Sequence, residues 1–262
     1  MVTALLEKGW ARWPVDPAVT GWTGHVLPIA KACVSDPAEQ AEWLQCEGTW
    51  FVGVDTLPNT PNGDVGGSGP LTGHAYQAVC DLYGVLPLHR GQISVIYPGY
   101  PRPRQGESEG GFRYRLKRDA AHVDGLLAVG SERRRMVRER HAYILGLPLT
   151  DCDGSASPLV VWEGSHRIMQ AAFAKALSHL PECDWDSVDL TDLYQATRRT
   201  VFDTCPRIPL PAKPGEAYVI HRLALHGVAP WAEGAAAPED GRMIAYFRPE
   251  LPAGTRDWLD AP

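Results

Sequence analysis

The sequence predicts a mainly β protein with flanking helices, in which short antiparallel strands form a sandwich or a barrel. From about residue 92 onward, short segments rich in β-branched and aromatic residues recur, separated by turn-forming residues. The 26 glycines and 23 prolines among 262 residues favour many turns and short elements over a few long helices. The apolar fraction of 44%, which includes nine Trp and nine Tyr, is sufficient for a sizeable core. We interpret residues 1–262 as a single domain.

The N-terminal part, residues 1–90, is predicted to be a mixed helical and strand support for the rest of the chain. A helix is expected to start after Asp36, because Asp is a good N-cap and Pro follows it at the first helical position. A second helix is predicted within 71–83, where apolar residues recur at helical spacing. A strand over 49–54 and a Gly- and Pro-rich loop over 58–70 lie between them.

The β-rich core is predicted over 91–250, and 251–262 is a C-terminal tail. A helix at about 166–180 interrupts the core, with Ser165 as its expected N-cap and apolar residues on one face. The predicted strands are 92–97, 114–124, 142–149, 159–162, 217–220, 224–228 and 243–247.

Charge and composition exclude several kinds of partner. The net charge of −6 gives the molecule no electrostatic reason to bind nucleic acid or an anionic membrane. The apolar runs are shorter than the ~20 residues of a membrane span, and the N-terminus does not resemble a signal peptide. The six cysteines form no Cys-x-x-Cys pair, so we expect free thiols in a reducing compartment. The sequence therefore predicts a cytoplasmic protein acting on a small molecule, and it does not indicate an oligomeric state.

His122 and Asp124 are the first residues that indicate chemistry. On a strand, residues two apart point to the same side, so these two side chains are expected to project together. An imidazole nitrogen beside a carboxylate oxygen provides two of the three ligands of a facial metal triad. A strand-end histidine bonded to its neighbouring carboxylate is the structural alternative.

Two later segments contribute further residues. A strand over 217–220 leads through a turn to His226, which we favour over His221 as a ligand because His221 is expected at the surface or in the turn. Arg242 is the first residue of a predicted strand that follows an Ala/Gly/Pro-rich loop. A guanidinium at that position could bind a carboxylate through two parallel hydrogen bonds. Arg248 has the same strand parity, but its position near the strand end favours a surface salt bridge.

Taken together, these segments resemble the phytanoyl-CoA dioxygenase-like family. The resemblance is carried by His122-x-Asp124, Pro158-Leu-Val-Val-Trp-Glu-Gly-Ser-His166-Arg, Gly215 followed by His226, and Arg242 on the next strand. It covers roughly residues 90–250. Members of this family are Fe(II)/2-oxoglutarate-dependent oxygenases with a double-stranded β-helix core, which is a jelly-roll, cupin-like fold.

The resemblance implies a site and a reaction. His122, Asp124 and His226 would ligate Fe(II), and Arg242 would bind the distal carboxylate of the co-substrate 2-oxoglutarate. The implied enzyme is a non-heme iron dioxygenase that hydroxylates a small organic substrate and releases succinate and CO2. Hydroxylation is favoured because Asp124 is retained, whereas related halogenases have a small residue there. The chain departs from the family at Val228, where a serine often helps to hold the co-substrate.

Basic residues raise the option of an anionic substrate. Arg118 shares the predicted strand parity of His122, and Arg102 and Arg104 lie in a Pro/Gly loop that could form a lid. The stretch 113–140 holds nine basic side chains. We favour a solvated surface or a subunit contact for that stretch, and its role stays open. The basic side chains are Arg113, Arg115, Lys117, Arg118, Arg133, Arg134, Arg135, Arg138 and Arg140.

Two other functions are compatible with the same residues. A cupin-like isomerase or dioxygenase would use the triad without 2-oxoglutarate, and a non-catalytic jelly-roll module would bind metal only for stability or sensing. Arg242 separates the first alternative from the oxygenase, because only the oxygenase needs a carboxylate anchor.

Overall fold

The computed structural model describes residues 1–253 and 257–262. Its helices are α1 (Val2–Lys8), α2 (Pro17–Ser35), α3 (Pro37–Trp43), α4 (His74–Tyr83), α5 (Glu109–Lys117), α6 (Ser165–Leu177), the 3-10 helix η1 (Glu182–Ser187), α7 (Thr191–Thr204) and α8 (Asp257–Asp260). The strands are β1 (Trp10–Trp13), β2 (Leu44–Gln45), β3 (Trp50–Phe51), β4 (Gln92–Ile96), β5 (Leu126–Val129), β6 (Arg134–Val137), β7 (Tyr143–Pro148), β8 (Leu159–Trp162), β9 (Arg207–Leu210), β10 (Ala217–His221), β11 (His226–Val228) and β12 (Arg242–Phe247).

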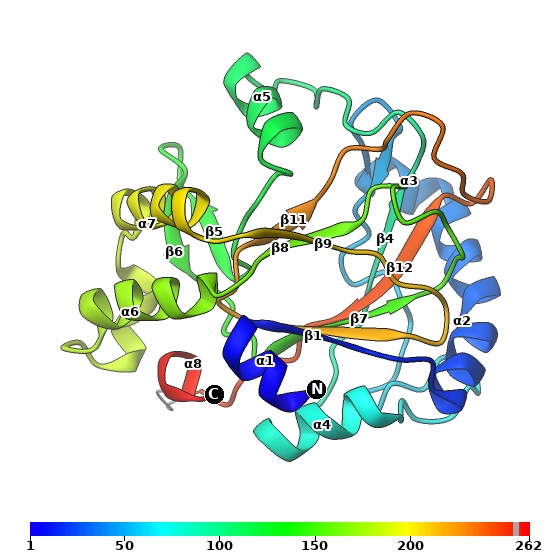
Figure 1. The fold of residues 1–262 in the computed structure, drawn as a ribbon, viewed down its shortest axis with the longest axis horizontal. Coiled ribbons are helices and arrows are strands. Elements are labelled where there is room, and N and C mark those ends of the chain that lie inside the picture. The colour runs from blue at the N-terminus through cyan, green and yellow to red at the C-terminus, as the bar shows by residue number, and fades with distance from the viewer. Residues whose placement is uncertain (254–256) are drawn as a thin grey trace.

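Two antiparallel sheets form the centre of the molecule. The main sheet has the strand order β1-β10-β7-β12-β4-β3-β2, and the second sheet has the order β11-β8-β9. The N-terminal strands β1, β2 and β3 lie at the two edges of the main sheet, so residues 1–90 extend the sheet as well as supporting it. Figure 1 shows the second sheet facing the main one, with α6 and α7 beyond one end of both.

The two faces of the main sheet pack against different partners. Leu145 and Val219 belong to a large buried cluster that includes side chains of α2 and α4. Their neighbours Ile144 and Tyr218 belong to a second cluster, together with Val161 of β8. Because successive strand residues point to opposite faces, the even-numbered positions of β7, β10 and β12 face the second sheet. This interior is where the predicted site residues are expected.

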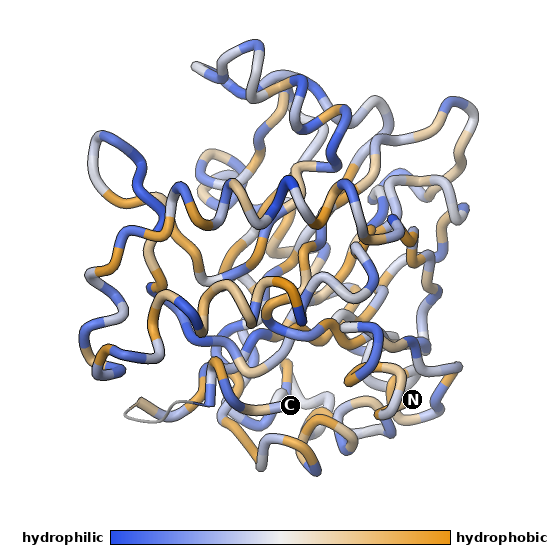
Figure 2. The backbone as a smooth tube through the Cα atoms, turned by 60° about the vertical axis from the view of Figure 1, so that its left-hand side comes forward, coloured by the Kyte–Doolittle hydropathy of each residue, from blue (hydrophilic) through white to orange (hydrophobic). Residues whose placement is uncertain are grey.

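Helices cover the outer surface of this arrangement. Along the coiled segments in Figure 2 the colour alternates between hydrophobic and hydrophilic, as amphipathic helices that cover a core require. Among the described residues, every helix is too short or too polar to cross a lipid bilayer.

Most predicted core elements are confirmed. The strand predicted at 159–162 is β8, and β4, β7, β10 and β12 lie within one residue of their expected positions. Asp36 is the N-cap of α3, and its side chain accepts the N–H of Ala38 at 2.8 Å. The inserted helix is α6, but Gly164 is its N-cap, whereas the Ser165 hydroxyl accepts the N–H of Leu225 at 2.8 Å.

The strand predicted over 114–124 is wrong, because much of it lies in helix α5 and the turn that follows. The Ser108 side chain caps this helix by accepting the N–H of Gly111, and Glu109 pairs with Arg113 one turn later. After α5 the backbone turns through Asp119 and Ala120, which both have positive φ. This turn brings the chain into the interior immediately before His122.

Candidate metal centre

His122, Asp124 and His226 come together, although the first two lie in the segment between α5 and β5 and the third lies on β11. His122 follows the turn after α5, and His226 opens β11. Their backbones pair directly: the N–H of His122 donates to the carbonyl of His226 at 2.8 Å, and the reverse bond is 3.0 Å long. The convergence predicted from sequence is therefore present, although a single bridge rather than a long strand places His122.

Two glycines allow the backbone to approach this closely. A Cβ on Gly227 would lie 2.2 Å from the carbonyl oxygen of Asp119, so a larger residue after His226 would push β11 away from the turn. Gly125 follows Asp124 with φ of 80°, and a Cβ there would lie 2.1 Å from the carbonyl oxygen of Glu139. Both positions flank the triad, so its geometry depends on them.

The three side chains present one set of donor atoms. One ligand atom from each residue lies within 4.8 Å of the others. Oδ1 of Asp124 is 3.1 Å from Nε2 of His122 and 3.8 Å from Nε2 of His226. Nδ1 of each histidine lies 3.0 Å from a backbone carbonyl, that of Ala120 or Ala224. With Nδ1–H donating to these carbonyls, Nε2 of each ring faces Asp124 and is the nitrogen that a metal ion would take.

Charge and burial set the protonation of the triad. Burial raises the pKa of Asp124, but Arg248 and the two imidazoles outweigh it, so the net pKa lies well below the usual range. Burial lowers the pKa of His226 to about 4, against the opposing charge of Asp124. Burial also lowers the pKa of His122, but the hydrogen bond and charge of Asp124 outweigh it, so the net pKa of His122 is raised. At neutral pH Asp124 is therefore a carboxylate and His226 a neutral imidazole, and a metal ion must displace the proton that Asp124 favours on His122. The side chain of His122 is 49% exposed, so the cluster is open on that side.

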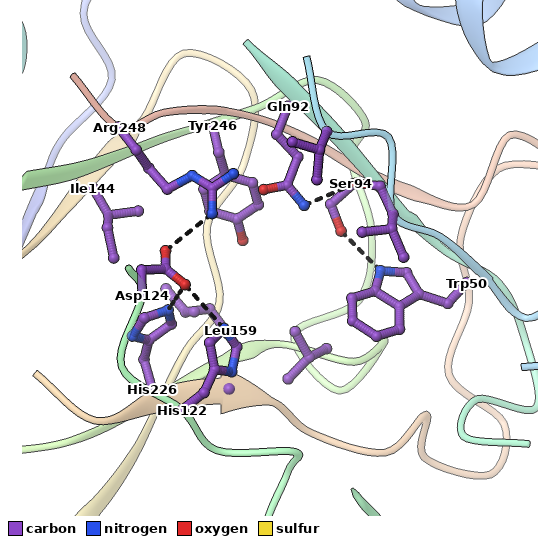
Figure 3. Close-up of a pocket in the computed structure, with 14 residues that line it drawn as sticks. Trp50, Gln92, Ser94, His122, Asp124, Ile144, Leu159, His226, Tyr246 and Arg248 are labelled. Carbon is purple, nitrogen blue, oxygen red and sulfur yellow. Dashed lines mark hydrogen bonds and ion pairs between the residues drawn. The ribbon is translucent and has the colours of Figure 1, made fainter. Parts of the chain in front are cut away.

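A cavity of about 190 Å³ adjoins the triad. Figure 3 shows Asp124 and the two histidines on one side of it and Trp50 on the opposite side. The lining residues are Trp50, Val52, Val54, Gln92, Ser94, His122, Asp124, Ile144, Leu159, His226, Gly227, Val228, Tyr246 and Arg248.

Arg248 lines this cavity, so its interpretation as a surface salt bridge is wrong. Its Nη1 lies 3.3 Å from Oδ2 of Asp124, and its side chain is only 14% exposed. Its backbone is held by His89 and His141, whose ring nitrogens contact the carbonyl oxygen of Arg248 at 3.1 and 2.9 Å. Arg242 and Arg248 are six residues apart and so have the same strand parity, and the even-numbered positions of β12 face the second sheet. This shared parity was the sequence signal that Arg248 also faces the interior.

Arg242 is buried but does not line the same cavity. It lies at the opposite end of β12, beside Tyr218 and Tyr246, whose hydroxyls hydrogen-bond at 2.8 Å. It contributes to a separate cavity of about 280 Å³, together with Thr150 and Cys152. The structure thus brings His122, Asp124 and His226 together but not Arg242. Tyr246 lies beside Arg242 and lines the cavity of the triad, which Arg242 does not line.

The other predicted basic residues lie outside the cavity. Arg102 pairs with Glu47 at 3.7 Å, and the Arg104 guanidinium lies 4.9 Å from the ring centroid of Trp50. Arg118 lies over the ring of Phe202 at 4.5 Å. The expectation that Arg118 shares a strand face with His122 is wrong, because Arg118 is the C-cap of α5 and does not belong to a strand.

Several cations of the stretch 113–140 have partners in the fold. Arg115 pairs with Glu107 at 2.6 Å, and Arg134 pairs with Glu132 at 2.6 Å. Arg138 lies 4.0 Å from Asp186, and Arg140 pairs with Glu182. The position expected for His221, at the surface or in the turn, is wrong. His221 ends β10 and is buried against His166, with ring centroids 4.8 Å apart.

Sequence reasoning missed the residues that form the rest of the cavity. Trp50, Gln92, Ser94 and Tyr246 line it. Alternation along 92–97 and 243–247 assigns Gln92, Ser94 and Tyr246 to one face of their strands, but nothing in the sequence identifies which face is the interior. Trp50 belongs to a strand of two residues, which gives no periodic signal.

Comparison with known proteins supports the fold. No family model and no curated protein matches the sequence. The non-heme alpha ketoglutarate dependent carbocyclase SnoK from nogalamycin biosynthesis is 14% identical, with a TM-score of 0.53 over 98% of this chain and 87% of that one. The epimerase SnoN, in complex with Fe3+, alpha ketoglutarate and nogalamycin RO, is 13% identical, with a TM-score of 0.51 over 100% and 88%. EctD from S. alaskensis with bound Fe is 16% identical, with a TM-score of 0.47 over 98% and 81%.

The likenesses to SnoK and SnoN confirm the predicted fold class. The chain is mostly antiparallel β with helices, and its large sheet corresponds to that of the cupin-like 2-oxoglutarate oxygenases. At such low identity the comparison establishes the fold and leaves the reaction to be inferred from the site.

Proposed function

We propose that the protein is an oxygenase that uses Fe(II) and 2-oxoglutarate to hydroxylate a small organic molecule, with release of succinate and CO2. The observation that carries this proposal is the convergence of His122, Asp124 and His226 on the wall of one cavity. The folds of SnoK and SnoN support it, since both are described as alpha ketoglutarate dependent enzymes. The narrower resemblance to the phytanoyl-CoA dioxygenase-like family stays a prediction.

The donor set fits ferrous iron. Two imidazoles and one carboxylate form the facial triad that non-heme Fe(II) oxygenases use, and this set leaves adjacent positions open for other ligands. The Nδ1 contacts with Ala120 and Ala224 fix both rings with Nε2 toward Asp124. When bound, Fe(II) with 2-oxoglutarate and dioxygen supplies the oxidant for attack on a C–H bond.

The remaining residues hold charge and exclude water. Arg248 neutralises the outer oxygen of Asp124 and keeps that carboxylate ionised and oriented. The apolar side chains of Ile144, Leu159 and Val228 border the triad and keep the reacting region dry. The exposed side of His122 is the side from which small molecules would reach the site.

Two arginines are candidates for the co-substrate carboxylate. The family resemblance assigns this role to Arg242, whereas the cavity favours Arg248, which lines it beside the triad. Nε of Arg248 is buried and has no hydrogen-bond partner within the described chain, so the guanidinium retains donors for a carboxylate. We therefore assign a carboxylate of 2-oxoglutarate to Arg248 and retain Arg242 as the second candidate.

The test is succinate release by the purified protein with Fe(II), 2-oxoglutarate and oxygen. We expect slow release without substrate, and loss of it in His122→Ala, Asp124→Ala and His226→Ala, while His25→Ala on the surface of α2 stays active. Fe(II) binding without any succinate release, across a broad substrate panel, would instead favour a cupin-like enzyme that works without 2-oxoglutarate. Arg242→Ala and Arg248→Ala, compared by their KM for 2-oxoglutarate, identify the carboxylate anchor.

A further inference from the structure

The cavity has two chemically different walls. β4 and β12 supply a polar strip that includes Gln92, Ser94 and Tyr246. β3 and the residues after it supply an apolar wall of Trp50, Val52 and Val54, which we call the β3 wall. In Figure 3 Trp50 lies across the cavity from Asp124 and the two histidines. A molecule held on the β3 wall would therefore face the metal triad.

Contacts from outside the cavity hold Trp50 in place. The guanidinium of Arg104 lies 4.9 Å from its ring centroid and that of Arg115 lies 5.9 Å away. The ring of Tyr100 packs edge-on at 5.9 Å. Glu107 joins these parts, because its carboxylate accepts from the Arg115 side chain at 2.6 Å and from the N–H of Arg104 at 3.1 Å. None of these four residues lines the cavity.

These contacts determine what Trp50 can offer to a ligand. Its indole Nε1–H already donates to Ser94 at 3.2 Å, so the side chain presents ring surface and no free donor. Two guanidinium groups already lie within 6 Å of the ring centroid, and their positive charge disfavours a cationic ligand at the same ring. An uncharged ring avoids this repulsion and can stack on the indole. Val52 and Val54 extend the surface with apolar area.

The charges around the cavity disfavour an anionic substrate. Among the lining residues in the described chain, Arg248 is the cation of fixed charge, and it pairs with Asp124. Arg102 and Arg118, which were expected to attract an anion, contact Glu47 and Phe202 outside the cavity. Arg104 lies against the ring of Trp50 and does not itself line the cavity. A phosphate or a second carboxylate would therefore find no unpaired Lys or Arg among the described residues that line the cavity.

We propose that the β3 wall is the substrate-recognition surface, that Trp50 is its specificity-determining residue, and that the substrate presents a compact, uncharged ring to it. The word substrate here rests on the proposed oxygenase function. Ring stacking on Trp50 places a ring carbon or a ring substituent across from the triad. Recognition comes from the shape and the aromatic surface of the wall.

The test uses metal-free protein, so that it does not depend on iron or 2-oxoglutarate. Binding of 4-methylphenol and of 1-heptanol, which have the same number of heavy atoms, is compared by ligand-detected NMR titration. We expect 4-methylphenol to bind more tightly, Trp50→Phe to keep its affinity within about threefold, and Trp50→Ala to lose at least about tenfold. Trp10→Ala is the matched control, because Trp10 is also half-buried, with its indole bonded to Glu163 and a cation, Lys8, near its ring.

Three results would overturn the proposal. Equal affinity of Trp50→Ala and wild type for 4-methylphenol would remove Trp50 from recognition. If 1-heptanol bound as tightly as 4-methylphenol, the wall would select for general hydrophobicity and not for a ring. Tighter, Trp50-dependent binding of 4-methylbenzoate would show that the wall takes an anion. If the ring probes behave as expected but succinate is never released, the β3 wall remains a binding surface and only the oxygenase function fails.

Discussion

Nη1 of Arg248 lies 3.3 Å from Oδ2 of Asp124, the oxygen that does not face the two histidines. The pair links the end of β12 to the segment after α5, and it places a positive charge behind the only carboxylate of the triad. It explains why the pKa of Asp124 falls despite burial, which by itself would raise it. Metal affinity and protonation at this site are therefore coupled through Arg248.

Replacement of Arg248 by Gln tests this coupling. Without the guanidinium the pKa of Asp124 rises toward its usual range, so protons compete with metal at higher pH than in the wild type. We expect Fe(II) affinity to fall about 10-fold to 100-fold, as for other residues that orient metal ligands. The loss should be larger at mildly acidic pH. Anaerobic Fe(II) titration at two pH values measures this loss of affinity. Arg242→Gln is the control. Unchanged Fe(II) affinity in Arg248→Gln would contradict the coupling.

Metal binding should raise the thermal stability of the protein. A ligand that binds only the folded state contributes about 2.7 kcal/mol at a free concentration of 100 times Kd. We expect the melting temperature to rise with anaerobic Fe(II) and to return after chelation. His226→Ala should abolish this rise, whereas His179→Ala, on the surface beyond α6, should not. A rise of equal size in His226→Ala would place the metal elsewhere.

The ion pair between Asp119 and Arg207 should stabilise the turn that carries His122. Asp119 is buried and accepts two hydrogen bonds from Arg207, at 2.7 and 2.8 Å. Its carbonyl oxygen also accepts the N–H of Val228 at 2.9 Å. We expect Asp119→Ala to lower the free energy of unfolding by about 2–3 kcal/mol, because it leaves charge-assisted donors unpaired.

Chemical denaturation measures this change, with Glu109→Ala as a matched control. Glu109 pairs with Arg113 on the exposed face of α5, where the loss should stay within about 0.5 kcal/mol. Equal effects of the two substitutions would show that the Asp119 pair adds nothing beyond an ordinary surface pair.

Buried His221 should make the protein less stable in acid. Burial lowers the pKa of His221 well below 6.5, with smaller contributions from Arg222 and His166. As the pH falls through about 6.5, His221 therefore binds a proton in the unfolded chain but stays neutral in the folded chain. The stabilising effect of neutral His221 is fully present above that pH and is lost as the pH falls below it.

The expected slope is at most about 1.4 kcal/mol per pH unit for this one group. Free energies of unfolding measured between about pH 7.5 and about pH 5.5 check it. His221→Gln should flatten the slope, and His25→Gln on an exposed surface should not. If both variants kept the wild-type slope, other groups would have to account for any loss of stability in acid.

The sequence alone determined the parts of the fold that rest on periodicity. Strands β4, β7, β8, β10 and β12 alternate or run as short apolar segments between turns, and this pattern is local. This pattern did not identify helix α2, because Gly21, Gly24 and Pro28 disfavour a helix. Burial of residues such as Trp22 and Val26 in the core under the main sheet stabilises this helix instead. Nor did the pattern identify α5, whose Gly and Arg content carries no apolar stripe.

The same division applies to the site. His122, Asp124 and His226 could be named from the sequence, because metal ligands are chemically distinctive and the first two are two residues apart. Only the tertiary structure decided that Arg248 rather than Arg242 lies beside them, and that Trp50 forms the opposite wall. Strand parity gives a residue's face but not its depth along the strand, and depth is set by the register between strands and by how the two sheets pack.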